Sequence, residues 1–221
     1  MDANYNLNGL TERIKARLKD AEYSDTDIAQ FINDAYFEIL GDTHYQFLEQ
    51  TYRASSQTTG ELLLPLDYQT LVHFTATLKH IPHPLRYIPS ADFFNSNKDS
   101  GIKNYTYTIY GNRLLYSLPN IEDVKDDDGE EMFYTLDLYY LAKPKKLVNG
   151  NDRPVIPYEY GEALVLLAQA RAEQLRDNFD YAQIYENKAD DLITSMKERY
   201  CPRQQEGGNR AKLPVFQILR H

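Results

Sequence analysis

The spacing of apolar residues changes twice along the chain, from a helical period to a strand period and back. Between Leu7 and Leu40 apolar side chains recur at three- and four-residue steps, which is the pattern of amphipathic helices. From about residue 50 to residue 143 they tend to alternate, as in half-buried strands. The helical spacing returns between residues 158 and 200. The sequence therefore predicts two helices, a β-rich segment and two more helices.

Residues with special backbone or capping roles mark the ends of several elements. Ser24 with Asp27 three residues later resembles a capping box at the start of a helix. Asp180 with Gln183 has the same spacing and predicts a second capping box before the last helix. In the middle segment, Gly111-Asn112 lies between two runs of alternating residues and predicts a β-hairpin.

The two helical pairs come from opposite ends of the chain, so we expect them to pack together in one bundle. The predicted fold class is α+β: a four-helix bundle of two N-terminal and two C-terminal helices, with an antiparallel β insertion and an extended C-terminal arm. The expected segments are an N-terminal helical hairpin at 1–49, the β-rich insertion at 50–153, the C-terminal helical pair at 154–201 and a flexible arm at 202–221.

One loop is strongly acidic in a chain whose net charge is −9. Residues 122–131 contain seven acidic residues and a single lysine. Such a run is ordinarily a solvated loop, and we expect it to be exposed. Its acidic residues are Glu122, Asp123, Asp126, Asp127, Asp128, Glu130 and Glu131.

The C-terminal end is basic and apolar, and a polar spacer containing Gly207-Gly208 separates it from the last helix. Apolar side chains left in water are unfavourable, so we expect this end to bind a partner as a docking arm. The alternative is that Val215 and Phe216 fold back onto the helices of their own chain. The candidate docking residues are Arg210, Lys212, Leu213, Pro214, Val215, Phe216, Ile218, Leu219 and Arg220.

The sequence lacks the motifs of several enzyme and metal-binding classes. There is no Gly-rich phosphate loop and no paired-histidine zinc motif, and Cys201 is the only cysteine. The acidic run does not fit a calcium loop, because Gly129 in the sixth position would put Val124 first and Thr135 last. We therefore predict no enzyme activity, no catalytic residues, no cofactor and no bound metal.

Two further classes are disfavoured by charge and hydropathy. The second helix contains no Lys or Arg between Ala21 and Gly41 but five acidic residues, so DNA phosphates would repel it as a recognition helix. No apolar run approaches the roughly 20 residues that cross a bilayer, so we expect no membrane partner. Nineteen tyrosines without a tryptophan indicate protein–protein contact surfaces instead.

Five segments carry a family likeness through their order and spacing. They are "DIAQFINDAYFEIL" (27–40), "LPLDYQTL" (64–71), "YTIYGNRLLYSLP" (107–119), "LDLYYLAKPKKL" (136–147) and "VIPYEYGEALVLLAQARAEQ" (155–174). Over roughly residues 5 to 200 the chain resembles the head-to-tail adaptor (connector) proteins of tailed bacteriophages.

This resemblance implies a structural virion protein of the neck, assembled in the host cytoplasm as a homo-oligomeric ring of about twelve copies. Such a ring docks under the portal through a C-terminal arm, extends the DNA channel used in ejection and provides the attachment surface for tail or neck proteins. Double-stranded DNA would pass through the lumen without specific binding, and the acidic loop would face this channel or a neighbouring subunit. The alternatives are a head-closure or tail-terminator ring and, from another class, a metal-dependent nucleic-acid-processing accessory or hydrolase.

Overall fold

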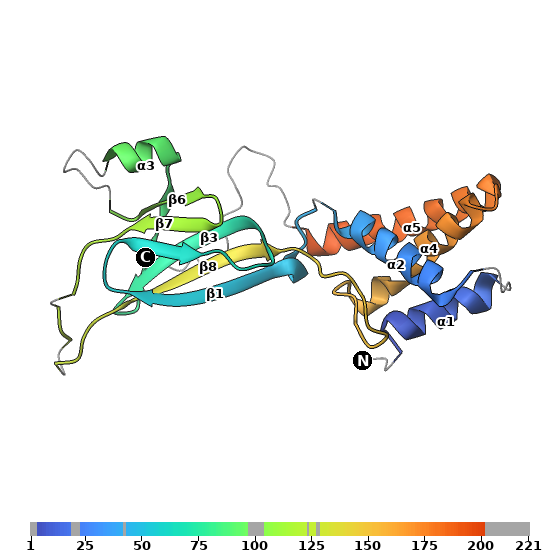
Figure 1. Ribbon diagram of the computed structural model, residues 1–221, viewed down its shortest axis with the longest axis horizontal. Helices are drawn as coiled ribbons and strands as arrows, with labels where there is room; N and C mark the ends of the chain where they lie inside the picture. Colours follow the sequence, from blue (N-terminus) through green and yellow to red (C-terminus); the bar gives the residue numbers. More distant parts are fainter. Residues whose placement is uncertain are drawn as a thin grey trace. The chain divides into compact units, whose positions relative to one another are not determined.

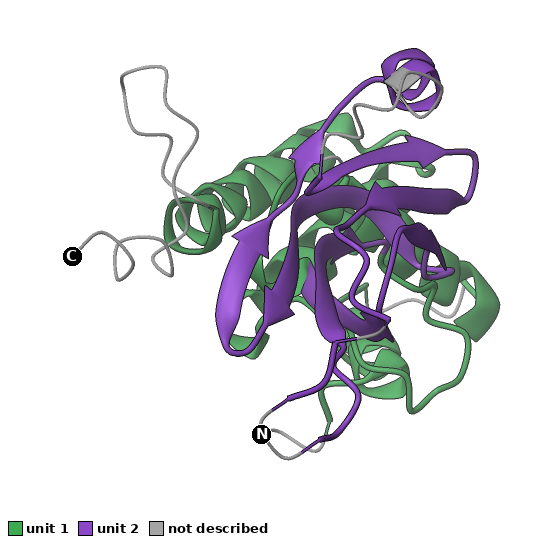
Figure 2. Ribbon diagram, turned by 90° about the vertical axis from the view of Figure 1, so that its left-hand side faces the viewer, with its two compact units in different colours: residues 1–48, 144–221 green, residues 49–143 purple. Residues whose placement is uncertain are grey.

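The chain forms two compact units, and the N- and C-terminal parts of the chain share one of them (Figure 2). The helical unit comprises residues 1–48 and 144–221, and the sheet unit comprises residues 49–143. The computed structural model describes residues 4–18, 23–41, 43–96, 104–122, 124–126 and 129–201.

Helix α4 is the central element of the helical unit. It packs against α1, α2 and α5 (Figure 1). Ten of its fourteen residues are buried. A helix that is apolar on nearly all sides must be surrounded by other elements. The α-helices of this unit are α1 (Leu7–Leu18), α2 (Asp25–Leu40), α4 (Gly161–Gln174) and α5 (Phe179–Tyr200), and its short 3₁₀ helices are η1 (Gln46–Leu48) and η2 (Tyr158–Tyr160).

The predicted fold class, a four-helix bundle with an antiparallel insertion, is wrong. Four helices of a bundle share a core that lies between them, whereas here α4 itself fills the centre. Helix α5 packs along α4 and buries only four of its 22 residues. The described residues form an α+β fold of five α-helices and two four-stranded sheets, in which strands make up a large fraction. The predicted C-terminal arm lies outside the described residues.

One of the two predicted capping boxes is confirmed. Ser24 Oγ accepts a hydrogen bond from the Asp27 N–H at 3.3 Å, and an Asp27 carboxylate oxygen accepts one from the Ser24 N–H at 3.0 Å. The second capping box is wrong, because α5 begins at Phe179 and places Asp180 inside its first turn. Asn178 is the N-cap residue, and its side chain donates to Glu173 instead of capping the helix.

A buried asparagine fastens the returning chain to α2. Asn33 is 2% exposed, and its Nδ2 donates to the carbonyl oxygens of Ala29 at 2.8 Å and Leu147 at 3.0 Å. Its Oδ1 accepts from the Leu147 N–H at 2.8 Å. The side chain thus satisfies both backbone groups of Leu147, at a position where an unpaired polar group is costly.

The sheet unit consists of two four-stranded sheets. Their strand orders are β1-β8-β3-β4 and β2-β7-β6-β5. The predicted hairpin at Gly111-Asn112 is confirmed, because β6 and β7 pair antiparallel on either side of it. The expectation of a purely antiparallel segment is wrong, since β5 and β6 pair in parallel. The elements are β1 (Glu49–Ser56), β2 (Gly60–Leu63), β3 (Tyr68–Leu78), β4 (Ile81–Pro84), β5 (Arg86–Tyr87), α3 (Ser90–Ser96), β6 (Thr106–Tyr110), β7 (Arg113–Ser117) and β8 (Tyr134–Ala142).

Strand β8 supplies the middle of the core in this unit. It lies between β1 and β3 (Figure 1). Every second side chain of the strand points into the core. These side chains are Tyr134, Leu136, Leu138 and Tyr140, all buried. The sheet unit therefore has a hydrophobic core of its own, formed from both sheets.

We predict that Asn33→Ala destabilises the helical unit. The change leaves the buried N–H and C=O of Leu147 without their side-chain partner, so the free energy of unfolding should fall by about 1–3 kcal/mol. Urea denaturation followed by circular dichroism measures this. Gln30→Ala is the matched control, because Gln30 is exposed on the same helix and its loss should change stability by no more than about 0.5 kcal/mol. Equal stabilities for the two variants would contradict the role given to Asn33.

Candidate interaction surfaces

The two sequence-predicted sites are described to different extents. The docking-arm residues, all between positions 210 and 220, lie outside the described residues. Of the acidic loop, Asp123, Asp127 and Asp128 also lie outside them. The described acids are Glu122, Glu130 and Glu131, which are exposed, and Asp126, which is half-buried.

The acidic loop closes through a short backbone turn. The Asp126 N–H donates to the Glu130 carbonyl oxygen at 2.9 Å, and the Glu130 N–H donates to Asp126 Oδ1 at 2.9 Å. Lys125 and Glu131 form an isolated antiparallel bridge at its base. Gly129 has a φ of 83°, a left-handed conformation that glycine adopts readily. The loop is thus a small hairpin in which the side chains of Glu122, Glu130 and Glu131 are exposed to solvent.

The base of this loop is anchored beside the end of β1. Ile121 and Met132, on either side of the loop, are both buried. The Ile121 N–H donates to the carbonyl oxygen of Gln57 at 2.9 Å, and the Gln57 side chain donates to the Met132 carbonyl oxygen at 3.1 Å. Because Gln57 directly follows β1, the strongest concentration of negative charge in the chain adjoins one end of that strand.

The described residues contain no group of three or more His, Cys, Asp or Glu side chains that could hold a metal ion. In the same part of the chain, no helix combines the length and apolar character that crossing a membrane requires.

The edges of the two sheets differ in how they are protected. Edge strand β4 contains Pro82 and Pro84, which lack the N–H that strand addition needs. Edge strands β5 and β2 are only two and four residues long. Edge strand β1 has eight residues, contains no proline or lysine, and pairs with β8 in an unbroken register. Among the described strands, β8 is its only partner.

The two faces of β1 are chemically different. On the outer face Arg53 pairs with Asp137 of β8, with Nε and Oδ1 2.6 Å apart, and this hydrogen bond raises the pKa of Arg53. On the core face Ala54 is half-buried and Tyr52 is 40% exposed. The sequence analysis predicted a β-rich segment over these residues but missed the open edge. The available signal was the contrast between the prolines of β4 and their absence from β1.

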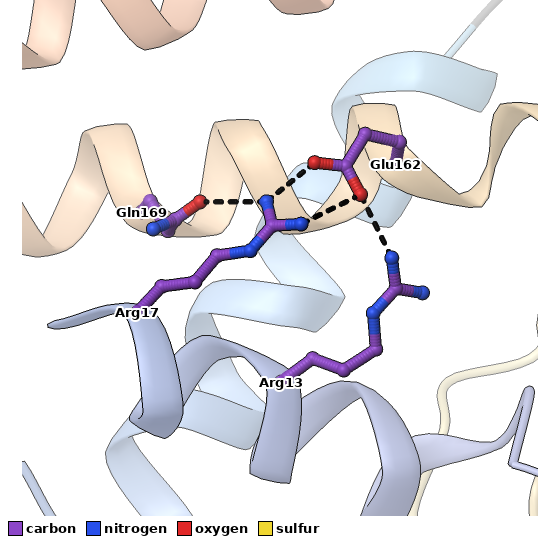
Figure 3. Close-up of polar contacts among 4 residues, drawn as sticks. All are labelled: Arg13, Arg17, Glu162 and Gln169. Atoms are coloured by element: carbon purple, nitrogen blue, oxygen red, sulfur yellow. Dashed lines mark hydrogen bonds and ion pairs between the residues drawn. The ribbon is translucent and has the colours of Figure 1, made fainter. Parts of the chain in front are cut away.

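A cluster of charged side chains in the helical unit holds α1 on α4. Glu162 accepts hydrogen bonds at Oε2 from Arg13 at 2.8 Å and from Arg17 at 3.1 Å, and Arg17 also binds its Oε1 (Figure 3). Arg17 reaches the buried side chain of Gln169 at 3.4 Å. Glu162 lies in the first turn of α4, where the helix dipole favours a negative charge. This geometry gives the arginines a structural role in joining two helices.

Two exposed apolar surfaces stand out, one in each unit. The first, which we call the helical corner, lies at the junction between the end of α4 and the start of α5. It consists of Leu175, Phe179, Tyr181 and Ile184, whose side chains are each at least 47% exposed. The aromatic cluster of the sheet unit consists of Phe94 and Tyr110, both exposed, whose rings meet edge to face at 5.7 Å. Exposed apolar groups gathered in this way are typical of protein-binding surfaces.

We predict that neutralising the acidic loop leaves the fold intact. The triple change Asp126→Asn, Asp127→Asn and Asp128→Asn removes three charges but keeps a side-chain oxygen at position 126 that can accept from the Glu130 N–H, so stability should change by no more than about 0.5 kcal/mol per position. Thermal unfolding and calcium titration by calorimetry check this. A large fall in melting temperature, or stoichiometric calcium binding by the unmodified protein, would show that the loop is a structural or metal site.

Comparison with known proteins gives one match. The model of a family of phage adaptors, described as SU10 adaptor protein, matches residues 5–212, which is nearly the whole chain. No curated protein matches the sequence.

Proposed function

Since the chain belongs to the SU10 adaptor protein family, and is therefore a phage adaptor protein and virion component, we propose that it forms a structural ring between portal and tail. The family match over residues 5–212 is the observation that carries this proposal. The role is structural and not enzymatic. The head-closure or tail-terminator ring named above is the alternative within the same structural class.

Ring assembly is supported by the two exposed apolar surfaces. A closed ring of identical copies needs two different patches on each copy that bind each other head to tail. The helical corner is built of aliphatic and aromatic side chains, whereas the aromatic cluster is built of a tyrosine and a phenylalanine. They give each copy two candidate patches of different chemistry, and a ring of about twelve copies would bury both.

Passage of DNA through such a ring is supported by the charge of the chain. Double-stranded DNA binds tightly to proteins that neutralise its phosphates with Lys and Arg. The net charge of −9 disfavours such binding and keeps the duplex mobile in a channel. The acidic loop would add to this effect if it faces the channel, and it would meet a basic partner if it faces a neighbouring subunit.

Docking on the portal is assigned to the C-terminal arm. Five apolar residues lie among residues 213–219, and each could contribute about 1.5–3 kcal/mol when buried. Ordering the segment costs roughly 1–2 kcal/mol per residue, so one arm alone would bind weakly. Arms repeated around a ring act together through their effective concentration and give a firm joint.

We predict that truncation after Pro202 abolishes binding to the portal but not folding. The described helices and sheets all end by Cys201, so helicity and melting temperature should be retained. Circular dichroism and co-sedimentation with the purified portal of the same phage measure the two properties. An unfolded truncated protein would favour an arm that folds back on its own helices, and normal portal binding would remove the docking role of the arm.

A further inference from the structure

The edge of β1, whose only partner among the described strands is β8, can accept another strand. In an antiparallel pair, every second residue of an edge strand turns its N–H and C=O away from its partner. Along the eight residues of β1, these groups form a row with no proline, lysine or bulge to block it. Extended peptides bind such edges through main-chain hydrogen bonds, with side-chain pockets supplying specificity.

The C-terminal end of the chain has the length and composition of such a strand. Residues 213–219 include Val215, Phe216 and Ile218, which are residue types common in strands. Seven extended residues span about 23 Å, close to the roughly 26 Å of an eight-residue strand. Pro214 stands near the start of the segment, a position in which strands tolerate proline. Residues 202–212 form a spacer that can extend up to about 38 Å.

The charges on the two segments are complementary. The acidic loop adjoins the Gln57 end of β1, where the Ile121 N–H binds the Gln57 carbonyl oxygen. Arg210 and Lys212 precede the apolar segment, and Arg220 follows it. An added strand would therefore bring a basic residue beside the acidic loop in either direction. Opposite charges within about 10 Å attract each other at moderate salt.

Two apolar side chains of the arm suit the core face of β1. Alternate residues of a strand point to opposite faces, so Phe216 and Ile218 would share one face. Placed on the core face, they would cover Tyr52, which is 40% exposed, and lie near half-buried Ala54. Gln217 would then lie on the outer face together with Leu213, Val215 and Leu219, beside the row that contains Arg53.

We propose that β1 of one copy binds residues 213–219 of a second copy as an added strand, with the acidic loop holding a basic residue of the arm. When identical copies exchange the same segment, β1 of each copy pairs with the arm of another copy through one kind of contact. Copies that have not met a portal are held together in this way. The pairing of the arm with β1 does not depend on the proposed function. Only the later transfer of the arm from β1 to the portal rests on that function.

Hydrogen exchange of full-length protein without portal tests this pairing. Amides of residues 49–56 should become several-fold more protected as protein concentration rises, and sedimentation should show a parallel increase in average mass. Gln217→Pro, which removes an N–H from the middle of the arm, should abolish both effects. Gln217→Asn, which keeps that N–H, should retain them, and the triple asparagine variant of the acidic loop should weaken them. Unchanged melting temperatures establish that all variants are folded.

Three outcomes would overturn the proposal. If the β1 amides are protected equally at all protein concentrations and this protection is lost in Gln217→Pro, the arm pairs with its own chain. If the β1 amides remain protected in Gln217→Pro, the arm is not the strand that pairs with β1. Absence of any protection until another phage protein is added would assign the edge to that protein. None of these measurements involves the portal, so failure of portal docking would leave the result on β1 unaffected.

Discussion

The helical unit depends on contacts that join residues 114 to 151 positions apart in the chain. The chain leaves this unit after residue 48 and returns to it at residue 144, so closing it has an entropic cost. Three polar contacts mark the closure: Asn33 with Leu147, the Tyr5 hydroxyl with the Ile156 carbonyl oxygen at 2.9 Å, and Arg13 with Glu162. Each fastens a residue of the returning chain to the N-terminal part, and the apolar helix α4 then fills the centre.

The packing at the start of α4 shows how closely the two ends approach. A Cβ atom on Gly161 would lie 2.5 Å from the Tyr5 ring, a distance that no real contact allows. Tyr5 is buried, and burial raises the pKa of its hydroxyl, which donates to the backbone instead of ionising. Because the helical unit closes on itself, the segment between residues 48 and 144 is free to build a second core. Strand β8 organises that core, and the sheet leaves β1 as its longest open edge.

Two of the three local signals in the sequence predicted local structure correctly, whereas the capping box expected at Asp180 and Gln183 was wrong. Ser24 and Asp27 form their capping box, and the turn at Gly111-Asn112 joins β6 and β7, because both features depend on residues within a few positions. The four-helix bundle was wrong because periodicity shows which helix faces are apolar but not which helix lies in the centre. The parallel pairing of β5 with β6 depends on long-range contacts that have no local signature. The binding roles of the acidic loop and of the arm remain predictions, because both roles depend on partner molecules.

Imaging of purified portal incubated with this protein by electron cryomicroscopy tests the adaptor role most directly. The family membership and the two exposed apolar surfaces lead us to expect a closed, rotationally symmetric ring of this protein on one face of the portal. Its central opening should be wide enough for double-stranded DNA and continuous with the portal channel. A portal that stays bare, or that binds scattered single copies without a ring, would contradict the role proposed for this chain.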